Sequence, residues 1–549
     1  MRHIFDAKVP MRDGVRLSAD VYLPGEEGAY PAILVGTPYD NTMKSHVDMA
    51  SFFTRHGYAF MVYDVRGRYD SEGEFYPFFN EGPDGFDAVE WAASQPWCNG
   101  RIGMMGGSYR GWIQWATARE GPPHLETIVP TATGGNWLRE FPFLNGVPCL
   151  WMLQWLNFVG GRTNQNVAGT TVNWGRVLRH LPLRDMPRVL GREMPVWVDF
   201  MDHPDMGEFW EKVVFKESDF QAIDLPALHI TGYYDGDQPG ALHYYWGAVE
   251  HGPRPGDQYL LIGPWDHAGT RVPRRLLGGV DFTTEALVEM REVHLAWFNH
   301  WLKDVDNEVS KWPRTRFFVM GENKWGEMEA PWPKSPAYTP LYLHSGGAAN
   351  THMGDGKLLE DAGEDGYDEY QFNPLEPATT VQGFDAYGDA QEAPLDRRYL
   401  LRRDDYLVYT GPELGEPLEI LGPPRAELWV SSDCPDTDFF AYLFDVHPDG
   451  RSILVSRGLM RARYRHGLGE QRLLEPGRVE RLSVPMDSTC VKFLEGHRVR
   501  LAVTSSEFPR YAPNTNTGNP VATDTQIKVA SNRVHHGKAH PSRLLLPRT

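Results

Sequence analysis

Cysteine and long hydrophobic runs are both scarce in this 549-residue chain. The four cysteines are widely separated and form no CxxC pair; they are Cys98, Cys149, Cys434 and Cys490. This spacing favours reduced, buried thiols in a cytoplasmic protein over a disulfide framework or a zinc site. No run of about 18 apolar residues occurs, so we expect no spanning helix. The first residues lack the apolar stretch of a secretory signal, so none is expected.

Positive charge is also in deficit, with 54 Lys and Arg against 73 Asp and Glu and a formal charge of −19 at pH 7. Nucleic acid and anionic membranes would repel such a chain, so neither is expected as a partner. The sequence has no HExxH, no glycine-rich phosphate loop followed by Lys-Ser/Thr, and no dinucleotide fingerprint. We therefore expect a small-molecule substrate, no cofactor and no metal, and we leave a homo-oligomer open.

What the chain does contain is an alternation of strand-like and helix-like segments. Short apolar runs closed by Gly or Pro are typical of buried strands, and they lie at 31–38, 58–67, 101–107, 225–232 and 257–263. Segments with helical spacing of apolar residues lie at 46–57, 83–95, 112–120, 239–252 and 283–304. This order predicts an α/β fold, with a parallel sheet covered by helices on both faces.

Two departures from the alternation divide the chain into domains. A Trp- and Arg-rich, mostly helical stretch interrupts it, and an insertion between two such strands usually sits over the carboxyl edge of the sheet as a cap. From about Pro336, short β-rich runs alternate with turn residues, as in a β-sandwich or jelly roll. The expected domains are a core at 1–136 and 222–335, a cap at 137–221 and a sandwich at 336–549.

A serine between glycines and a helix-like run is a candidate nucleophile. In "RIGMMGGSYRGWIQWATA" a strand ends in small residues and a helix follows Ser108 directly, as a nucleophile elbow requires. The strict G-x-S-x-G spacing fails, because Arg110 stands where the second glycine is expected and Gly111 comes one position later. On this turn alone, a catalytic serine and an ordinary glycine-rich loop explain the pattern equally well.

Two residues further along the chain favour catalysis. Asp235 follows the strand-like run 225–232, and His267 follows the run 257–263. The order serine, acid, histidine is that of one fold of serine hydrolases, and it places all three residues at the same edge of the sheet. His267 would take the proton of Ser108, while Asp235 would orient the imidazole and stabilise its charged form.

Several motifs extend this pattern over nearly the whole chain. They are "GTPYD", "DVRGRYDSEGEF", "GGSYRG", "GYYDG", "GPWDH" and "WFNHWLKD", followed in the β-rich part by "DTDFFAYLFDVHPDG" and "SSEFPRYAPNTNTG". Together they resemble the cocaine esterase/X-Pro dipeptidyl-peptidase family of α/β-hydrolases, which includes the α-amino acid ester hydrolases. That family's elbow is G-x-S-Y-x-G, which "GGSYRG" fits. The resemblance implies an α/β-hydrolase core with an inserted helical cap and a C-terminal jelly roll. It also implies Ser108 as nucleophile, Asp235 as acid and His267 as base.

An oxyanion hole needs two donors aimed at the developing negative charge. The backbone N–H of Tyr109, the first residue after the candidate nucleophile, is one donor by geometry. Tyr39 matches the family's "PY" tyrosine, and the resemblance implies that its hydroxyl is the second donor. Without the resemblance, Tyr39 would be interpreted as an ordinary loop residue.

Substrate-binding residues are harder to predict than the catalytic ones. In the α-amino acid ester hydrolases, which this chain resembles, a carboxylate cluster grips the substrate ammonium, and part of it follows the catalytic acid at the second and third positions. Here those positions hold Asp237 and Gln238, so one carboxylate is kept and one is an amide. Asp237 either pairs with an amine or only caps the next helix. Aromatic cap residues either line an acyl pocket or pack the cap core; they are Trp137, Phe141, Trp151 and Trp155.

Three enzymatic activities and one non-enzymatic role follow from these residues. The leading hypothesis is cleavage of carboxylic esters through an acyl-enzyme, without a required amine. The second is an α-amino acid ester hydrolase or β-lactam acylase, which Asp237 favours and Gln238 disfavours. The third is an X-Pro dipeptidyl peptidase, which usually has an additional N-terminal domain, whereas the core here begins almost at Met1. A binding module without catalysis would keep its ligand when Ser108 is replaced.

Overall fold

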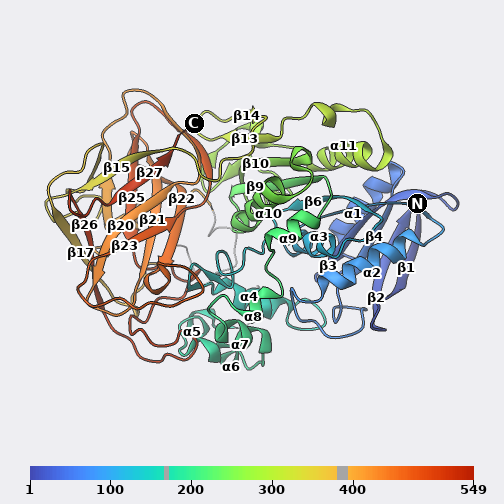
Figure 1. Cartoon of the computed structure of the whole chain (residues 1–549), viewed down its shortest axis with the longest axis horizontal. Helices are drawn as coiled ribbons and strands as arrows, with labels where there is room; N and C mark the ends of the chain where they lie inside the picture. The colour runs from blue at the N-terminus through green and yellow to red at the C-terminus, as the bar shows by residue number, and fades with distance from the viewer. Residues whose placement is uncertain (166–171, 380–392, 549) are drawn as a thin grey trace.

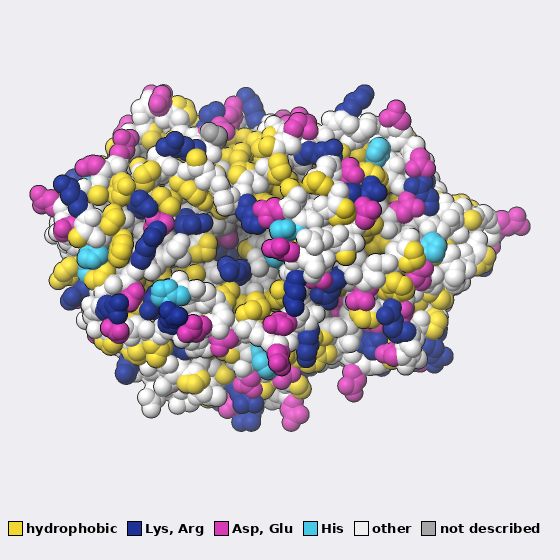
Figure 2. Space-filling view, in the orientation of Figure 1, with side chains coloured by type: hydrophobic (Ala, Val, Ile, Leu, Met, Phe, Trp, Pro, Cys, Tyr) yellow, Lys and Arg dark blue, Asp and Glu magenta, His cyan; other side chains and the backbone are white. Residues whose placement is uncertain are grey.

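The computed structural model describes residues 1–165, 172–379 and 393–548. Figure 1 shows an α/β part on the right, a β-rich part on the left in yellow to red, and helices α4 to α8 below them. Within the described ranges no helix is long and apolar enough to cross a membrane. All four cysteines are buried free thiols, as expected. On the face drawn in Figure 2, acidic and basic side chains are interspersed.

A ten-stranded sheet forms the centre of the α/β part, in the order β1-β2-β4-β3-β5-β6-β9-β10-β13-β14. The seven strands from β4 to β13 in this order run parallel, and antiparallel strands close both edges. The strands are β1 (Arg2–Pro10), β2 (Arg16–Leu23), β3 (Tyr30–Thr37), β4 (Ala59–Asp64), β5 (Cys98–Gly107), β6 (Leu125–Thr131), β9 (Ala227–Tyr234), β10 (Gln258–Asp266), β13 (Thr315–Val319) and β14 (Lys324–Met328).

Helices cover both faces of this sheet. Alternate side chains of a strand point to opposite faces, so Leu34 and Met104 pack with α2 and α3, whereas Ile33 and Met105 pack with α1 and α11. Burial on both faces explains why the parallel strands are continuous apolar runs. The helices are α1 (Lys44–Arg55), α2 (Glu81–Ala93), α3 (Tyr109–Glu120), α10 (Gln238–His251) and α11 (Met290–Lys303).

The last helix of the core is shorter than its sequence predicts. Helix α11 begins at Met290, and the preceding segment forms only a short 3₁₀ turn, η3 (Thr284–Ala286). The carbonyls of Glu285 and Ala286 accept hydrogen bonds from the indoles of Trp325 and Trp265, at 2.8 and 3.0 Å. The prediction from Thr283 onward is wrong because these tertiary contacts occupy acceptors that a continued helix would use.

The inserted segment leaves the sheet after β6 and returns at β9. These two strands are neighbours, so the insertion starts and ends at the same carboxyl edge of the sheet. Trp197 and Trp210 are fully buried in it. Its elements are β7 (Phe143–Leu144), β8 (Val147–Pro148), α4 (Trp151–Val159), α5 (Trp174–Val177), α6 (Met186–Val189), α7 (Pro195–Asp202), α8 (Glu208–Glu211) and α9 (Glu217–Ala222).

The C-terminal part is a β-sandwich that packs on the core. Tyr245 of α10 and Phe318 of β13 share one apolar cluster with Leu428 and Val491 of the sandwich. Its strands are β15 (Tyr338–His344), β16 (Lys357–Leu359), β17 (Gly366–Phe372), β18 (Leu407–Thr410), β19 (Leu418–Gly422), β20 (Arg425–Ser432), β21 (Asp438–Val446), β22 (Ser452–Arg461), β23 (Glu480–Pro485), β24 (Thr489–Phe493), β25 (Arg498–Thr504), β26 (Ala530–His536) and β27 (Arg543–Pro547). A small hairpin in the core pairs β11 (Leu276–Leu277) with β12 (Val280–Asp281).

Candidate active site

Ser108 stands on a sharp turn between β5 and α3. Its φ is +64°, a left-handed conformation that costs a non-glycine residue free energy and marks sites where the surroundings impose it. The Ser108 N–H donates to the carbonyl of Thr131 at 2.9 Å, which fixes the turn against β6. Glycine is required on both sides: a Cβ at Gly106 would lie 2.7 Å from the Cβ of Arg110, and one at Gly111 would collide with Thr133. The spacing "GGSYRG" therefore builds the elbow geometry without glycine at position 110.

Asp235 and His267 form a hydrogen-bonded pair at the ends of β9 and β10. The Nδ1 of His267 lies 2.8 Å from Oδ1 of Asp235. The Thr231 hydroxyl donates to Oδ2 of Asp235 at 2.9 Å, and the Asp237 N–H donates to Oδ1 at 3.0 Å. The Asp235 side chain is fully buried, whereas that of His267 is 21% exposed. The carboxylate is thus held in one orientation, with the imidazole between it and the solvent.

The charges around this pair favour a protonated imidazole. Burial raises the pKa of Asp235, but the charge of His267 and the hydrogen bonds outweigh burial, so the pKa falls below its usual range. Burial and Arg271 lower the pKa of His267, whereas the carboxylates of Asp237 and Asp235 raise it more strongly, to about 9. The site therefore stabilises the imidazolium that forms when histidine accepts a proton from a nucleophile.

The Tyr39 hydroxyl lies beside Ser108. Burial raises the pKa of Tyr39, and hydrogen bonds with the side chains of Trp155 and Ser108 oppose that rise. The indole N–H of Trp155 donates to the Tyr39 oxygen at 3.1 Å. Because the indole occupies an acceptor site of this oxygen, the Tyr39 O–H stays available as a donor.

The side-chain hydroxyl of Tyr109 is hydrogen-bonded to groups other than Ser108 and Tyr39. Its hydroxyl donates to the buried carboxylate of Glu81 and accepts the N–H of Phe78 at 2.9 Å. Its backbone N–H belongs to the first residue of α3, directly after Ser108. Any role of Tyr109 at the serine therefore belongs to the backbone, as the sequence predicts.

Ser108 and His267 open into one cavity of about 170 Å³. Six other residues singled out from the sequence also line it; they are Tyr39, Tyr109, Phe141, Trp151, Trp155 and Asp237. Further lining residues come from distant segments and were not predicted to bind substrate; they are Phe78, Trp112, Met152, Arg271 and Arg510. Arg510 lies in "SSEFPRYAPNTNTG", so this motif of the β-rich part was a usable signal. Its presence shows that the C-terminal sandwich helps to enclose the cavity.

Gln238 and Trp137 take other positions. The Gln238 amide donates to the carbonyls of Gly232 and Ser488 and accepts the Ser488 N–H at 2.7 Å. The Trp137 indole donates to the carbonyl of Val213 and stacks on Trp210. Neither residue is among those that line the cavity. Gln238 joins the core to the sandwich, and Trp137 packs inside the cap.

The side chain of Asp237 lines the cavity and does not cap a helix. It stands at the N-cap position of α10, but its side chain accepts no capping hydrogen bond from that helix. Its carboxylate is 3.8 Å from Nδ1 of His267, and the residue is 8% exposed. The contacts therefore favour the electrostatic interpretation of Asp237 over the capping one.

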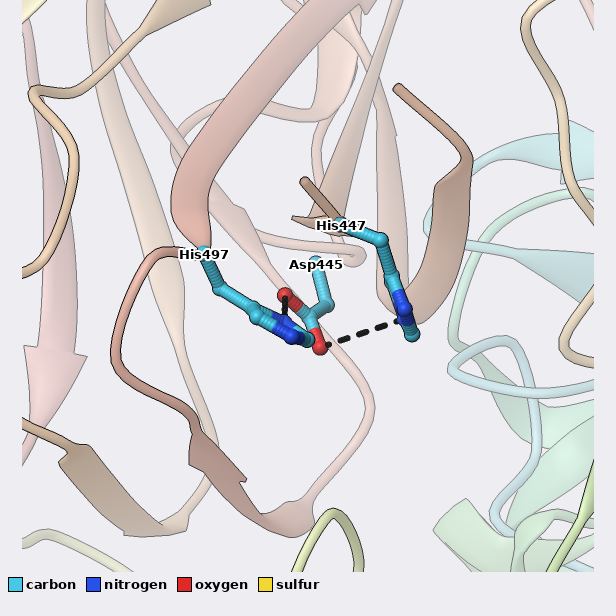
Figure 3. Close-up of side chains that lie close together, drawn as sticks. All are labelled: Asp445, His447 and His497. Carbon is cyan, nitrogen blue, oxygen red and sulfur yellow. Dashed lines mark hydrogen bonds and ion pairs between the residues drawn. The ribbon is translucent and has the colours of Figure 1, made fainter. Parts of the chain in front are cut away.

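A separate group of ionisable side chains lies in the sandwich. Figure 3 shows Asp445 between His497, whose Nδ1 is 2.7 Å away, and His447, whose Nε2 is 3.6 Å away. Among the described residues, this is the one group close enough to share a metal ion. The guanidinium of Arg451 donates to Nδ1 of His447 at 3.3 Å, which leaves the other ring nitrogen to donate towards Asp445. The hydrogen bonds of this cluster, including the one from the Arg451 guanidinium, thus explain why the three side chains lie together.

Fold and site together define an α/β-hydrolase with a serine at its elbow. Residues 13–269 match the X-Pro dipeptidyl-peptidase (S15 family) model, and residues 307–545 match the X-Pro dipeptidyl-peptidase C-terminal non-catalytic domain. The cocaine esterase of Rhodococcus sp. (strain MB1 Bresler) is 35% identical over 98% of this chain and 97% of its own length. The chain therefore belongs to the cocaine esterase/X-Pro dipeptidyl-peptidase family, and it is a serine hydrolase acting on esters or peptides.

Two solved structures share the complete architecture. An α-amino acid ester hydrolase has a TM-score of 0.88 and 25% identity, covering 100% of this chain and 96% of its own. An aminopeptidase from a marine sediment archaeon, Thaumarchaeota archaeon, has a TM-score of 0.87 and 26% identity, covering 99% and 96%. The α/β-hydrolase core, cap and sandwich thus occur together in relatives whose names describe both ester and peptide chemistry.

Proposed function

We propose that this chain hydrolyses carboxylic esters by acyl transfer, with Ser108 as nucleophile, His267 as base and Asp235 as the orienting acid. The observation that carries the proposal is the elbow serine sharing one cavity with a histidine that is bonded to a buried carboxylate. The similarity to the cocaine esterase favours ester substrates over peptides.

The proposed reaction uses each of these groups in turn. His267 accepts the Ser108 proton as the serine oxygen attacks the ester carbonyl carbon, and a tetrahedral oxyanion forms. The Tyr39 O–H and the Tyr109 N–H donate to that oxyanion. His267 then passes the proton to the departing alkoxide as the C–O bond breaks, which leaves an acyl group on Ser108. Water, activated by His267, repeats these steps and releases the carboxylic acid.

A fluorophosphonate probe tests the assignment of the nucleophile. We expect one adduct per chain, located by peptide mass spectrometry at Ser108, and no adduct in Ser108→Ala. Ser71→Ala is the matched control, because the Ser71 hydroxyl is buried and donates to the carbonyl of Asp64 at 2.7 Å. Labelling that persists in Ser108→Ala would assign the nucleophile elsewhere and defeat the proposal.

Asp237 supports a second candidate, hydrolysis of α-amino acid esters. A nearly buried carboxylate at the cavity can pair with the ammonium of such a substrate. Phenylglycine methyl ester and phenylacetic methyl ester differ mainly in this ammonium, so their kcat/KM ratio reports the interaction at roughly 1.4 kcal/mol per tenfold. A ratio well above ten that collapses in Asp237→Asn would establish the second candidate. A ratio near one leaves the general esterase.

The pH profile supplies an independent prediction for Asp237. Its negative charge raises the pKa of His267, and histidine must be neutral to act as the base. With phenylacetic methyl ester, Asp237→Asn should therefore move the acid limb of kcat/KM to lower pH. Arg271→Gln should move it to higher pH, because Arg271 lowers the same pKa. Profiles recorded from pH 5 to 10, about the range in which these groups titrate, would measure both shifts. If the acid limb stayed unchanged in both variants, it would not report the titration of His267.

A further inference from the structure

A second cavity lies against the other side of the elbow. Its volume is about 650 Å³, and its lining includes Gly106 and Gly107 at the end of β5 and residues of α1 and α11. Arg271 lines this cavity and the one at Ser108, and it packs directly on Gly107, where a Cβ would lie 2.9 Å from its guanidinium. The second cavity is therefore separated from the catalytic one by an arginine side chain.

Arginines outnumber carboxylates in the lining of this cavity. Arg110, Arg271 and Arg291 line it, and none of them forms an ion pair within the described part of the chain. The lining carboxylates are Asp48, which pairs with Lys44 at 2.6 Å, and Glu289. Such a concentration of unpaired guanidinium groups at a concave surface attracts anions.

Arg110 is held in place by a neutral imidazole. The His46 Nδ1–H donates to the carbonyl of Asp40 at 2.9 Å, so its Nε2 accepts from the Arg110 guanidinium at 2.7 Å. Burial and the nearby charge of Arg271 lower the pKa of Arg110 to about 10. The guanidinium groups of Arg110 and Arg271 are thus kept close together although their charges repel each other. A bound anion would relieve this repulsion.

Two further polar groups at the cavity have no partner. His294 of α11 is 8% exposed, and neither of its ring nitrogens has a hydrogen-bond partner among the described residues. The same holds for Nη1 of Arg271. Buried polar groups almost always have a partner, so these two fit a site that a ligand completes.

Much of the remaining wall of the cavity is apolar, with Ser45, Thr131 and Thr270 beside it. The apolar part is made by Met49, Phe60, Met105, Leu287 and Met290. A small inorganic anion would leave this surface uncovered, whereas a ligand with a hydrocarbon chain would cover it. We propose that the second cavity binds an organic carboxylate with an apolar chain. Arg271, Arg291 and His294 hold the carboxylate, and the chain lies on the apolar wall.

Two sources can supply this chemistry, and the site does not depend on the proposed reaction. One is the acid released by an esterase, and the other is a free fatty acid. Calorimetric titration of the full chain with octanoate tests binding, and octanamide is the uncharged match. We expect one octanoate per chain and binding of octanamide at least tenfold weaker, or about 1.4 kcal/mol. Phenylacetate binding comparable to that of octanoate would support a product acid; selective octanoate binding would support a fatty acid.

Variants separate the second cavity from the catalytic one. Arg291 and His294 line only the second cavity. The variants Arg291→Gln and His294→Phe should therefore each weaken octanoate binding at least tenfold. Trp151 lines only the catalytic cavity, so Trp151→Ala should leave octanoate binding unchanged. Arg275 is an exposed arginine paired with Asp281, and Arg275→Gln should also leave binding unchanged. Arg291 is exposed, so its variant keeps the test valid if His294→Phe fails to fold.

Three results would overturn the proposal. One is the absence of octanoate binding to the wild-type chain. Another is equal binding of octanamide or acetate, which would remove the role of the charge or of the apolar wall. The third is weakening by Trp151→Ala but not by Arg291→Gln, which would place the acid in the catalytic cavity.

Discussion

Replacing Ser108 with alanine should lower kcat for an aryl ester by about 10⁵- to 10⁶-fold, and His267→Ala should cost nearly as much. The double variant should lose no more than either single one. In the proposed mechanism the serine oxygen is a useful nucleophile only while His267 can take its proton, so the two side chains would act as one unit. The Tyr39 hydroxyl and the backbone at Tyr109 remain in every variant and should sustain the same residual rate.

Steady-state rates with each purified variant measure this non-additivity. Alanine at 108 would have to adopt the same left-handed φ as serine and would remove only the oxygen, so the thermal unfolding midpoint should hardly change. An additive loss in the double variant would mean that the two residues act in separate steps. A His267→Ala variant with near wild-type kcat would assign the base to another group.

Parts of the fold that depend on local pattern could be predicted from the sequence. Strands such as β3 and β9 are buried on both faces and therefore stand out as short apolar runs. Strand β6 is not predicted, because "LETIVPT" contains a half-buried glutamate and a proline among its apolar residues. Its position in the sheet is set by pairing with β5 and β9. The start predicted for α11 at Thr283 is wrong for a similar reason, since distant tryptophans bind carbonyls of the segment before Met290.

The candidate triad was predictable because it follows from chain order. Loops after neighbouring parallel strands meet at one sheet edge, so the positions of Ser108, Asp235 and His267 follow from the strand pattern. Contacts between the domains do not follow from chain order in this way. Gln238, outside the cavity, bonds to Ser488, 250 positions away, and only the packing of the sandwich on the core brings Arg510 to the cavity.

Replacing Tyr39 with phenylalanine should lower kcat by about 10²- to 10³-fold with little change in KM. In the proposed mechanism the Tyr39 hydroxyl donates to the oxyanion, which exists only after the serine oxygen has attacked, so its loss should destabilise the transition state more than the bound ester. The ring of phenylalanine preserves the packing against Phe158, whose ring centre lies 6.2 Å away. Steady-state kinetics with phenylacetic methyl ester would separate the effect on kcat from that on KM.

Trp155→Phe is the matched control for this prediction. It keeps the Tyr39 hydroxyl but removes the indole N–H that donates to the tyrosine oxygen, so it should cost kcat much less than Tyr39→Phe. Because the two residues would act through one hydrogen bond, the double variant should be no slower than Tyr39→Phe alone. If Tyr39→Phe instead raised KM and left kcat unchanged, the hydroxyl would bind the ground-state substrate. The second hydrogen-bond donor to the oxyanion, beside the Tyr109 N–H, would then be a group other than Tyr39.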